Sequence, residues 1–300
     1  MIEVLQAPPF ATLQDLGFPT GRAWGLPRCG AMDPLLLKLA NGLVGNPPHA
    51  AAIEWALGPG ALRAETALRL AVLGLASVAV DGVALDPPAL CFAVPAGAVL
   101  DIAPGVQRYS YVAVQGGFAV PALLGSRSTY LPGGFGGFAG RRLRGGDRLP
   151  VGVLRRGGPA HDVVVPETQA WEEEEIEIRV VRGPQWERFE PATRERFFAA
   201  PYQVDAASDR LGYRLAGPAV APREQATLPS EAACPGAVQV PDGGQPIVLM
   251  PDGPTVGGYP KLAVVIHADL RKLAQCRPGR TVRFREVSLE AARACYSEGR

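Results

Sequence analysis

The stretch CFAVPAGAVLDIAPGVQRYSYVAV, residues 91–114, contains three short runs of apolar and β-branched residues separated by proline and glycine. The runs are residues 91–94, 99–102 and 110–114. Each run has the length of one strand, and the Pro-Ala-Gly and Pro-Gly sequences between them are typical of tight turns. We therefore predict three short strands.

The same pattern extends over residues 53–153. Further β-prone runs occupy 68–73 and 77–80, and glycine pairs such as Gly116-Gly117 mark further turns. A spacing of about ten residues between short strands is typical of an antiparallel barrel or sandwich. Because long helices do not alternate with these strands, the pattern disfavours a Rossmann-like fold.

One amphipathic helix precedes this β-rich region. Asp33 can cap the free backbone amides, and Pro34 suits the first helical position. Apolar residues then recur at helical spacing until Gly45 and Asn46 end the helix. We expect this helix to cover a sheet.

The second half of the chain repeats the pattern of short strands with few helices. We predict strands at residues 176–181, 202–204, 213–215 and 262–266, two more within 236–261, and helices at 191–200, 269–275 and 289–296. The whole chain is therefore predicted to be mainly β.

We predict two domains, residues 1–160 and 161–300, with an approximate boundary at 155–175 and terminal strands free to cross between them. The four glutamates of residues 172–175 fall at this boundary. Four adjacent like charges seldom enter a core, so we interpret them as a linker or a solvated hairpin arm.

Composition and charge describe a globular chain without a strongly charged partner. Of its 300 residues 47% are hydrophobic and 20% are charged, and the net charge is +1. These values are typical of a soluble domain. Such a balance offers no electrostatic attraction to nucleic acid or to an anionic membrane.

Cysteine and histidine usage favours a reduced compartment and disfavours a metal site. The five cysteines are widely spaced and odd in number, and the chain has three histidines. The N-terminus lacks the basic and apolar segments of a signal peptide, and the longest apolar run is too short to cross a bilayer. We expect a cytoplasmic protein without a bound metal.

The common catalytic signatures, such as a Walker A loop or a Gly-x-Ser-x-Gly elbow, do not occur. Polar residues gather instead in glycine-rich loops. In residues 124–141, Arg127 offers a planar fork for a carboxylate or phosphate beside the hydroxyls of Ser126, Ser128 and Thr129. The structural alternative is a capped turn with Arg127 in an internal salt bridge.

Two further clusters lie in the second half. Residues 208–214 bring Arg210, Tyr213 and Arg214 close together, for binding an anion or for a structural ion-pair network. Residues 255–261 read Thr-Val-Gly-Gly-Tyr-Pro-Lys and end on Lys261, one of three lysines among 30 basic residues. That amine can meet a phosphate or a carboxylate, or it can simply be solvated in a hairpin loop.

A fourth polar group surrounds the predicted helix. We expect Asn41, Asn46 and Glu54 to hold loops through hydrogen bonds to the backbone. Cys29 has no neighbouring histidine or lysine, so a role as a nucleophile is unsupported.

Several of these motifs together resemble one family, the KipA/PxpC family. The family is also called allophanate hydrolase subunit 2, or biotin-dependent carboxyltransferase. The motifs keep their order over residues 10–290 and are Gln14-Asp-Leu-Gly17, Gly30-Ala-Met-Asp-Pro34, Ala40-Asn-Gly-Leu-Val-Gly-Asn-Pro47, Gly125-Ser-Arg-Ser-Thr129, Asp209-Arg-Leu-Gly-Tyr-Arg214, Gly244-Gln-Pro-Ile247 and Gly257-Gly-Tyr-Pro-Lys261. One departure is Gly74-Leu-Ala76, where the family usually has Gly-Ala-Asp.

The resemblance implies two cyclophilin-like β-barrel domains and a site shared with a KipI/PxpB-like subunit. Three activities accompany this architecture. They are ATP-dependent opening of 5-oxoproline to glutamate with a PxpA-like third subunit, biotin-dependent carboxyl transfer to urea, and regulation of a KipI-like inhibitor of a histidine kinase.

The biotin route usually places this module in a long polypeptide with a Met-Lys-Met carrier motif. No methionine flanks a lysine here. We therefore expect a subunit of an ATP-hydrolysing 5-oxoprolinase that is inactive alone, with the carboxyltransferase and the regulator as alternatives.

The predicted site residues come from these clusters. We expect Lys261, Arg127 and Arg214 to stabilise phosphate or the substrate carboxylate. The residues expected to bind substrate or nucleotide are Ser126, Ser128, Thr129, Arg210, Tyr213, Gln239, Thr255, Gly257, Gly258 and Tyr259.

Overall fold

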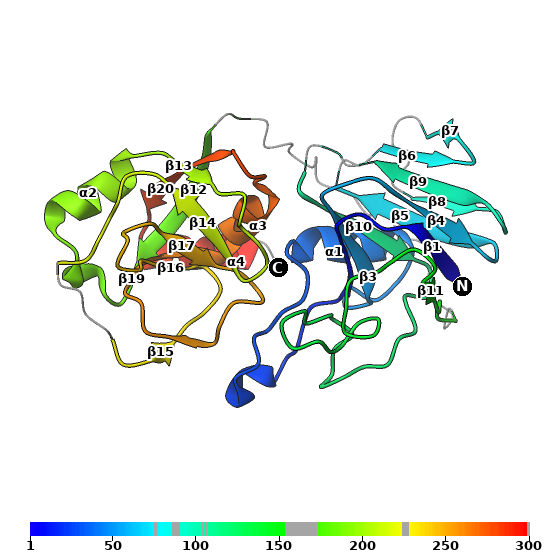
Figure 1. Cartoon of the computed structure of the whole chain (residues 1–300), viewed down its shortest axis with the longest axis horizontal. Coiled ribbons are helices and arrows are strands. Elements are labelled where there is room, and N and C mark those ends of the chain that lie inside the picture. Colours follow the sequence, from blue (N-terminus) through cyan, green and yellow to red (C-terminus); the bar gives the residue numbers. More distant parts are fainter. Residues whose placement is uncertain are drawn as a thin grey trace. The chain divides into compact units, whose positions relative to one another are not determined.

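The structure is a computed structural model that describes residues 1–74, 77–85, 91–103, 105, 107–153, 173, 175–223 and 228–298. The chain forms two compact units, Met1–Thr20 with Cys29–Ala170 and Gly21–Arg28 with Trp171–Arg300 (Figure 1). Most of the predicted boundary, and positions 75 and 76 of the divergent motif, lie outside the described residues. The boundary stays a prediction.

The first unit contains two antiparallel sheets. One has the order β11 (Arg148–Leu149), β1 (Ile2–Gln6), β4 (Gly60–Ala64), β9 (Val99–Ala103), β6 (Ser77–Val80) and β7 (Val83–Ala84). The other has the order β2 (Phe10–Gln14), β3 (Ala52–Ala56), β10 (Tyr109–Val114), β5 (Leu68–Leu73) and β8 (Cys91–Val94). The strands predicted from residues 91–114 are therefore confirmed.

One hydrophobic core joins the two sheets of the first unit. Leu62 and Leu100 from the first sheet and Ile53, Val72 and Val112 from the second belong to the same buried cluster. Burial of such side chains is worth about 1.5–3 kcal/mol each. The alternating apolar residues of the short strands supply this shared core.

The predicted helix is confirmed as α1 (Pro34–Leu43), which packs on β10 and β5. The Asp33 side chain accepts a hydrogen bond from the backbone N–H of Leu36 at 3.2 Å. Glu54 holds the preceding loop, because its carboxylate accepts from the Met32 N–H at 2.8 Å and from the Tyr111 hydroxyl at 2.7 Å. The structural role predicted for Glu54 is therefore confirmed.

The second unit contains a closed barrel. Its strand order is β12 (Glu175–Arg182), β19 (Lys261–Val265), β16 (Ala237–Gln239), β17 (Ile247–Leu249), β14 (Gly212–Ala216), β13 (Tyr202–Val204) and β20 (Thr281–Glu286). Outside it lie the two-stranded ribbon of β15 (Glu231–Ala232) and β18 (Val256–Gly257), and the 3-10 helices η1 (Gly21–Trp24) and η2 (Trp186–Arg188).

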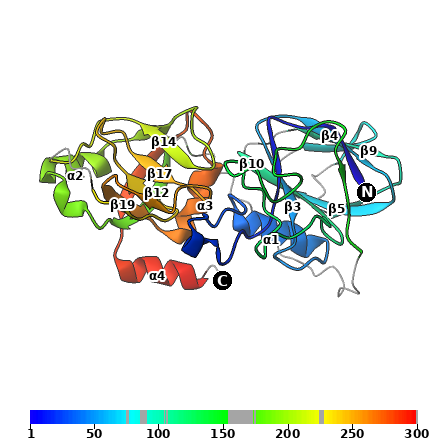
Figure 2. The ribbon, with the colours of Figure 1, turned by 60° about the horizontal axis from the view of Figure 1, so that its bottom comes forward.

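The described part of the second unit also contains three α-helices. They are α2 (Pro191–Ala199), α3 (His267–Gln275) and α4 (Leu289–Glu298), in agreement with the three predicted helices. Phe197 of α2 stacks on Phe284 of β20 with ring centroids 4.5 Å apart, which anchors this largely polar helix. Figure 2 shows α4 on the outside of the barrel.

The mainly β class is confirmed, with a closed barrel in the second unit and two sheets around one core in the first. Residues 172–175 were predicted to be a linker or a solvated hairpin arm, and at Glu175 the linker alternative is wrong although the side chain is 40% exposed. Glu175 begins β12 and forms an ion pair with Arg283 at 2.6 Å, because β12 lies beside β20. Glu172 and Glu174 lie outside the described residues.

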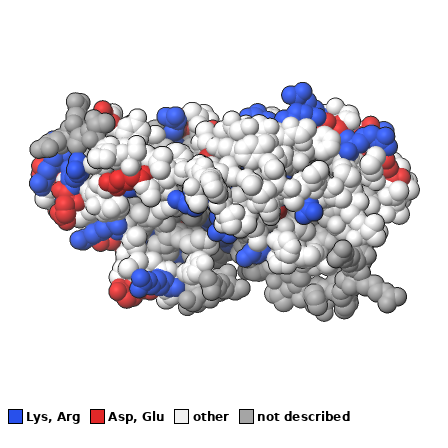
Figure 3. All heavy atoms as spheres, turned by 90° about the horizontal axis from the view of Figure 1, so that it is seen from below, with Lys and Arg blue, Asp and Glu red and all other residues white. Residues whose placement is uncertain are grey.

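Charged side chains on the face drawn in Figure 3 occur in small groups of both signs. No helix among the described residues is long and apolar enough to cross a membrane.

We predict that Asp269 makes an acid-sensitive contribution to the stability of the second unit. Its buried carboxylate accepts two hydrogen bonds from the Arg179 guanidinium, at 2.7 and 2.9 Å, and one from the Arg179 N–H at 2.8 Å. Burial alone would raise the pKa of Asp269, but these bonds and the neighbouring cations lower it below the ordinary value.

Because the folded-state pKa is lowered, the stabilisation is full above the unfolded pKa of about 3.9 and disappears as pH falls through the folded value. Asp269→Asn should cost about 3 kcal/mol at neutral pH, with a smaller difference from wild type below pH ~3.9, measured by urea unfolding. The control Glu187→Gln changes a carboxylate whose side chain is 83% exposed, and should shift stability by less than about 0.5 kcal/mol. A pH-independent difference for Asp269→Asn would contradict the prediction.

Candidate functional site

The hydroxyls of the first predicted cluster are bound inside the protein. Ser126 and Ser128 each donate a hydrogen bond to one carboxylate oxygen of Asp15, at 2.6 Å, and the Arg127 N–H donates to the other oxygen at 2.6 Å. Thr129 donates to the Leu13 carbonyl at 3.0 Å. These groups therefore shape the loop, as in the structural alternative.

Glycines of the same region pack closely on this loop. Gly136 has a positive φ of 74°, and a Cβ atom there would lie 2.1 Å from the Ser128 carbonyl oxygen. A Cβ atom at Gly137 would lie 1.9 Å from the Thr129 hydroxyl oxygen. At both positions the close approach of another chain segment requires glycine.

Arg127 keeps part of its guanidinium group available. Its Nε donates to the Val120 carbonyl at 2.8 Å, and the residue is half-buried. Among the described residues no ion pair to Arg127 is found, so the predicted internal salt bridge is not seen there. Its two terminal nitrogens remain candidates for binding an anion.

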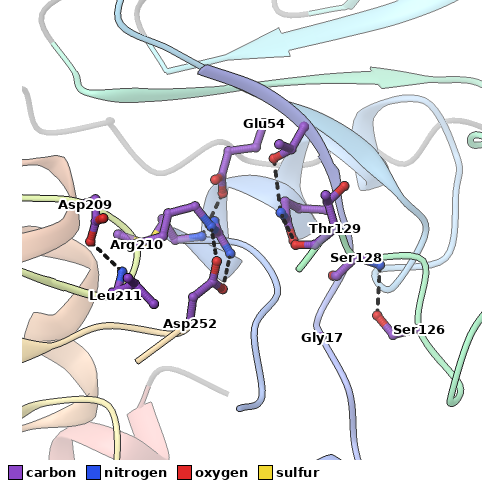
Figure 4. Close-up of polar contacts among 12 residues, drawn as sticks. Gly17, Glu54, Ser126, Ser128, Thr129, Asp209, Arg210, Leu211 and Asp252 are labelled. Atoms are coloured by element: carbon purple, nitrogen blue, oxygen red, sulfur yellow. Dashed lines mark hydrogen bonds and ion pairs between the residues drawn. The ribbon is translucent and has the colours of Figure 1, made fainter. Parts of the chain in front are cut away.

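The second predicted cluster is divided between structural contacts and one exposed cation. Figure 4 shows Arg210 facing Asp252, with which it forms a buried bidentate pair at 2.7 and 2.8 Å. The buried Tyr213 hydroxyl donates to the Ala274 carbonyl at 2.6 Å. Arg214 is exposed on β14 and has no ion-pair partner among the described residues.

Lys261 is buried and its amine meets a carboxylate. It is 4% exposed, and its Nζ lies 3.1 Å from Oε2 of Glu231. Gln185 accepts from the Lys261 N–H at 3.0 Å, and its Nε2 lies 2.9 Å from the same Glu231 oxygen. The hydrogen bonds from Lys261 and Gln185 lower the pKa of Glu231. The alternative of a solvated lysine is therefore wrong, because η2 and the β15–β18 ribbon place Gln185 and Glu231 around the amine.

Gln239 lies next to Lys261 in the barrel wall. The two residues are register partners across β16 and β19, at an irregularity in the pairing. Gln239 is 4% exposed, and its Nε2 has no hydrogen-bond partner among the described residues. On the other side of β16, Gln239 pairs with Ile247, which pairs with Arg214. Three of the predicted residues, Lys261, Gln239 and Arg214, thus lie in one row of paired residues that crosses β19, β16, β17 and β14.

The remaining predicted residues lie on the chain that leads to Lys261. Thr255 donates a hydrogen bond to the Gly25 carbonyl at 3.3 Å, and so fastens this segment to the chain after η1. Gly257 lies in β18 opposite Glu231, and the Gly258 carbonyl accepts from the Leu228 N–H. Tyr259 is 49% exposed. An added Cβ atom at Gly257 would meet the Gln239 amide.

The sequence interpretation missed the acidic partners of the predicted cations. Asp15 lies within the first family motif but was not predicted as a site residue, and Asp252 and Glu231 carried no local signal. Each lies at least 30 residues from its basic partner or bound loop. Only the folded chain reveals these pairs.

A cavity of about 260 Å³ lies elsewhere, in the first unit, beside β4, β6 and β9. None of the predicted site residues lines it. Among the described residues no group of three or more histidine, cysteine, aspartate or glutamate side chains is arranged to hold a metal ion.

A family model and two curated relatives each match most of this chain. Residues 24–286 match the model of the family described as carboxyltransferase domain, subdomain A and B. The chain is 38% identical to the 5-oxoprolinase C subunit of Escherichia coli and 36% identical to that of Haemophilus influenzae, covering 97% of this chain and 93% of each relative.

A solved structure extends the likeness to the fold. The urea amidolyase of Kluyveromyces lactis matches 99% of this chain with a TM-score of 0.90 and 29% identity. The chain spans 19% of that much longer protein.

We predict that Asp15 organises the loop of residues 126–128. Asp15→Asn should remove a charged acceptor from three donors of that loop, and hydrogen bonds to charged groups contribute about 1.5–3 kcal/mol each. Amide hydrogen exchange at Arg127 and Ser128 should accelerate about tenfold or more.

The matched control is Asp81→Asn, an exposed turn residue of the same unit that accepts one hydrogen bond from the Val99 N–H. Exchange at Arg127 and Ser128 should stay at the wild-type rate in this control. Wild-type exchange in Asp15→Asn would overturn the assignment.

Proposed function

Because the chain belongs to the carboxyltransferase domain family, subdomain A and B, we propose that it is the C subunit of a 5-oxoprolinase. The complex converts 5-oxo-L-proline to L-glutamate at the expense of ATP and water. In this proposal the enzyme is completed by a KipI/PxpB-like subunit and a PxpA-like subunit, and the isolated chain is inactive.

The observation that carries the proposal is similarity over nearly the full length to proteins that bear this name. Identity of 36–38% extends over 97% of this chain and 93% of both bacterial relatives. The match to the urea amidolyase of Lachancea kluyveri is weaker, at 32%, and covers 17% of that protein. Both measures favour the 5-oxoprolinase assignment.

The reaction suits a site built from cations and amide donors. The lactam of 5-oxoproline is a stable amide, and transfer of a phosphoryl group from ATP to its carbonyl oxygen makes the carbon more electrophilic. Water then adds to that carbon, and the ring C–N bond breaks as the nitrogen takes a proton and becomes the amino group. A second water hydrolyses the resulting acyl phosphate, which releases phosphate and leaves the glutamate carboxylate. Cations stabilise the phosphoryl group and the substrate carboxylate through these steps.

The proposed cations are Lys261 and Arg214 in the second unit and Arg127 in the first, each taken as a separate candidate for an anionic group. The buried Lys261 amine suits a fixed contact, because a buried charge is screened less than an exposed one. Arg127 and Arg214 have no ion-pair partner among the described residues, which leaves their guanidinium groups for an anion. Arg210 is less suited, since Asp252 neutralises it.

The carboxyltransferase alternative is favoured by the TM-score of 0.90 with the urea amidolyase of Kluyveromyces lactis, beside the family match and the 32% identity to the urea amidolyase of Lachancea kluyveri. In that reading a biotin group carried by another domain would supply the carboxyl group. Carboxylation of urea by the assembled proteins, without glutamate formation from 5-oxoproline, would favour this alternative.

We predict that the three co-purified proteins form glutamate from 5-oxoproline and ATP, and that omission of this chain abolishes the activity. Lys261→Ala should lower kcat/KM about tenfold or more, since it removes a charge-assisted contact. Glutamate formation is measured by amino-acid analysis.

Lys38→Ala is the matched control, because Lys38 is exposed on α1. It should retain wild-type kcat/KM. Full activity without this chain would overturn the function, whereas full activity of Lys261→Ala would overturn only the role of Lys261.

A further inference from the structure

The side-chain Nε2 of Gln239 is a buried donor that has no partner among the residues the structure describes. Gln239 is 4% exposed, and its Nε2 has no hydrogen-bond partner among the described residues. Buried donors are nearly always hydrogen-bonded, because an unpaired donor loses its water without compensation. An unpaired donor on a rigid strand beside a buried amine therefore points to a ligand oxygen.

Gly257 leaves room beside this amide. A Cβ atom at Gly257 would lie 2.8 Å from Gln239 Nε2, so the end of the Gln239 side chain would have to move from its present position. Gly257 does not have the positive φ that favours glycine. Backbone conformation therefore does not require glycine at position 257. A side chain there would instead fill the space next to the Gln239 amide.

The carboxylate of Glu231 already contacts the Lys261 amine in the folded chain. It lies opposite Gly257 in the β15–β18 ribbon and accepts hydrogen bonds from Lys261 Nζ at 3.1 Å and Gln185 Nε2 at 2.9 Å. Its side chain is 40% exposed, whereas that of Lys261 is 5% exposed. The acid can turn to solvent at little cost, and the amine cannot.

We propose that Lys261 Nζ and Gln239 Nε2 form a two-donor site for the oxygens of a small carboxylic acid, and that Glu231 binds the Lys261 amine when substrate is absent. The substrate carboxylate displaces Glu231 from Lys261, and a further oxygen of the substrate accepts from Gln239. This inference rests on the proposed function, in which the acid is 5-oxoproline. It assigns Gln239 as a substrate-contacting residue and Glu231 as an internal competitor.

The test measures binding of 5-oxoproline to the assembled three-protein complex by calorimetry, together with kcat/KM. Gln239→Ala removes the donor, and Gly257→Ala obstructs it without removing it. Each should weaken binding about tenfold. The matched controls are Gln203→Ala, at an exposed barrel position, and Gly243→Ala, where an added Cβ meets no atom within 4 Å. Both controls should bind as wild type.

The Glu231→Gln variant tests whether the Glu231 carboxylate competes with the substrate for Lys261 or instead helps the substrate to bind. Loss of the competing charge should tighten 5-oxoproline binding about threefold, and should leave binding of the neutral analogue 5-oxoprolinamide unchanged. Weaker binding of 5-oxoproline, or an equal gain for both compounds, would overturn the competitor role.

The outcomes also separate this inference from the proposed function. If wild-type complex binds 5-oxoproline and forms glutamate while Gln239→Ala and Gly257→Ala, both folded by thermal melting, bind normally, the two-donor site is wrong. If the wild-type complex neither binds 5-oxoproline nor forms glutamate, the proposed function is overturned and the site assignment with it.

Discussion

Parallel pairing of β12 with β20 is the constraint on which the second unit depends, because it closes the barrel. Three exposed ion pairs lie along this seam, and each contributes about 0–1 kcal/mol. The larger contribution comes from the apolar face of β12, where Ile176, Ile178 and Val180 are buried. Closure leaves β19 held between β12 and β16, and so fixes Lys261 beside Gln239.

Most polar groups that stand out in the loops serve the fold. Asp15 gathers the hydroxyls of Ser126 and Ser128, and Asp252 binds Arg210. Such satisfied networks make a loop rigid, since breaking one leaves a buried group unpaired. The Gln239 amide differs because its donor is buried and has no partner among the described residues, although it stands in a closed barrel.

Much of the fold follows from local pattern. Short β-prone runs divided by proline and glycine predicted the strands of residues 91–114, and Asp33-Pro34 predicted the start of α1. Local pattern could not predict that η1 joins the second unit or that Glu175 belongs to β12. Both depend on contacts between segments far apart in sequence. A run of glutamates is also compatible with a linker as well as with the exposed face of a strand, so it does not distinguish the two.

The sequence alone was sufficient for the mainly β class and the order of family motifs, and it singled out Lys261 and Gln239, whose role as site residues stays a proposal. It did not distinguish a solvated lysine from a buried one, or a ligand-binding arginine from a structural one. Those distinctions came from folding, which brings Glu231 and Gln185 to Lys261 and Asp252 to Arg210. The physical reason is that the state of a charge depends on its burial and its partner, and neither is encoded by neighbouring residues.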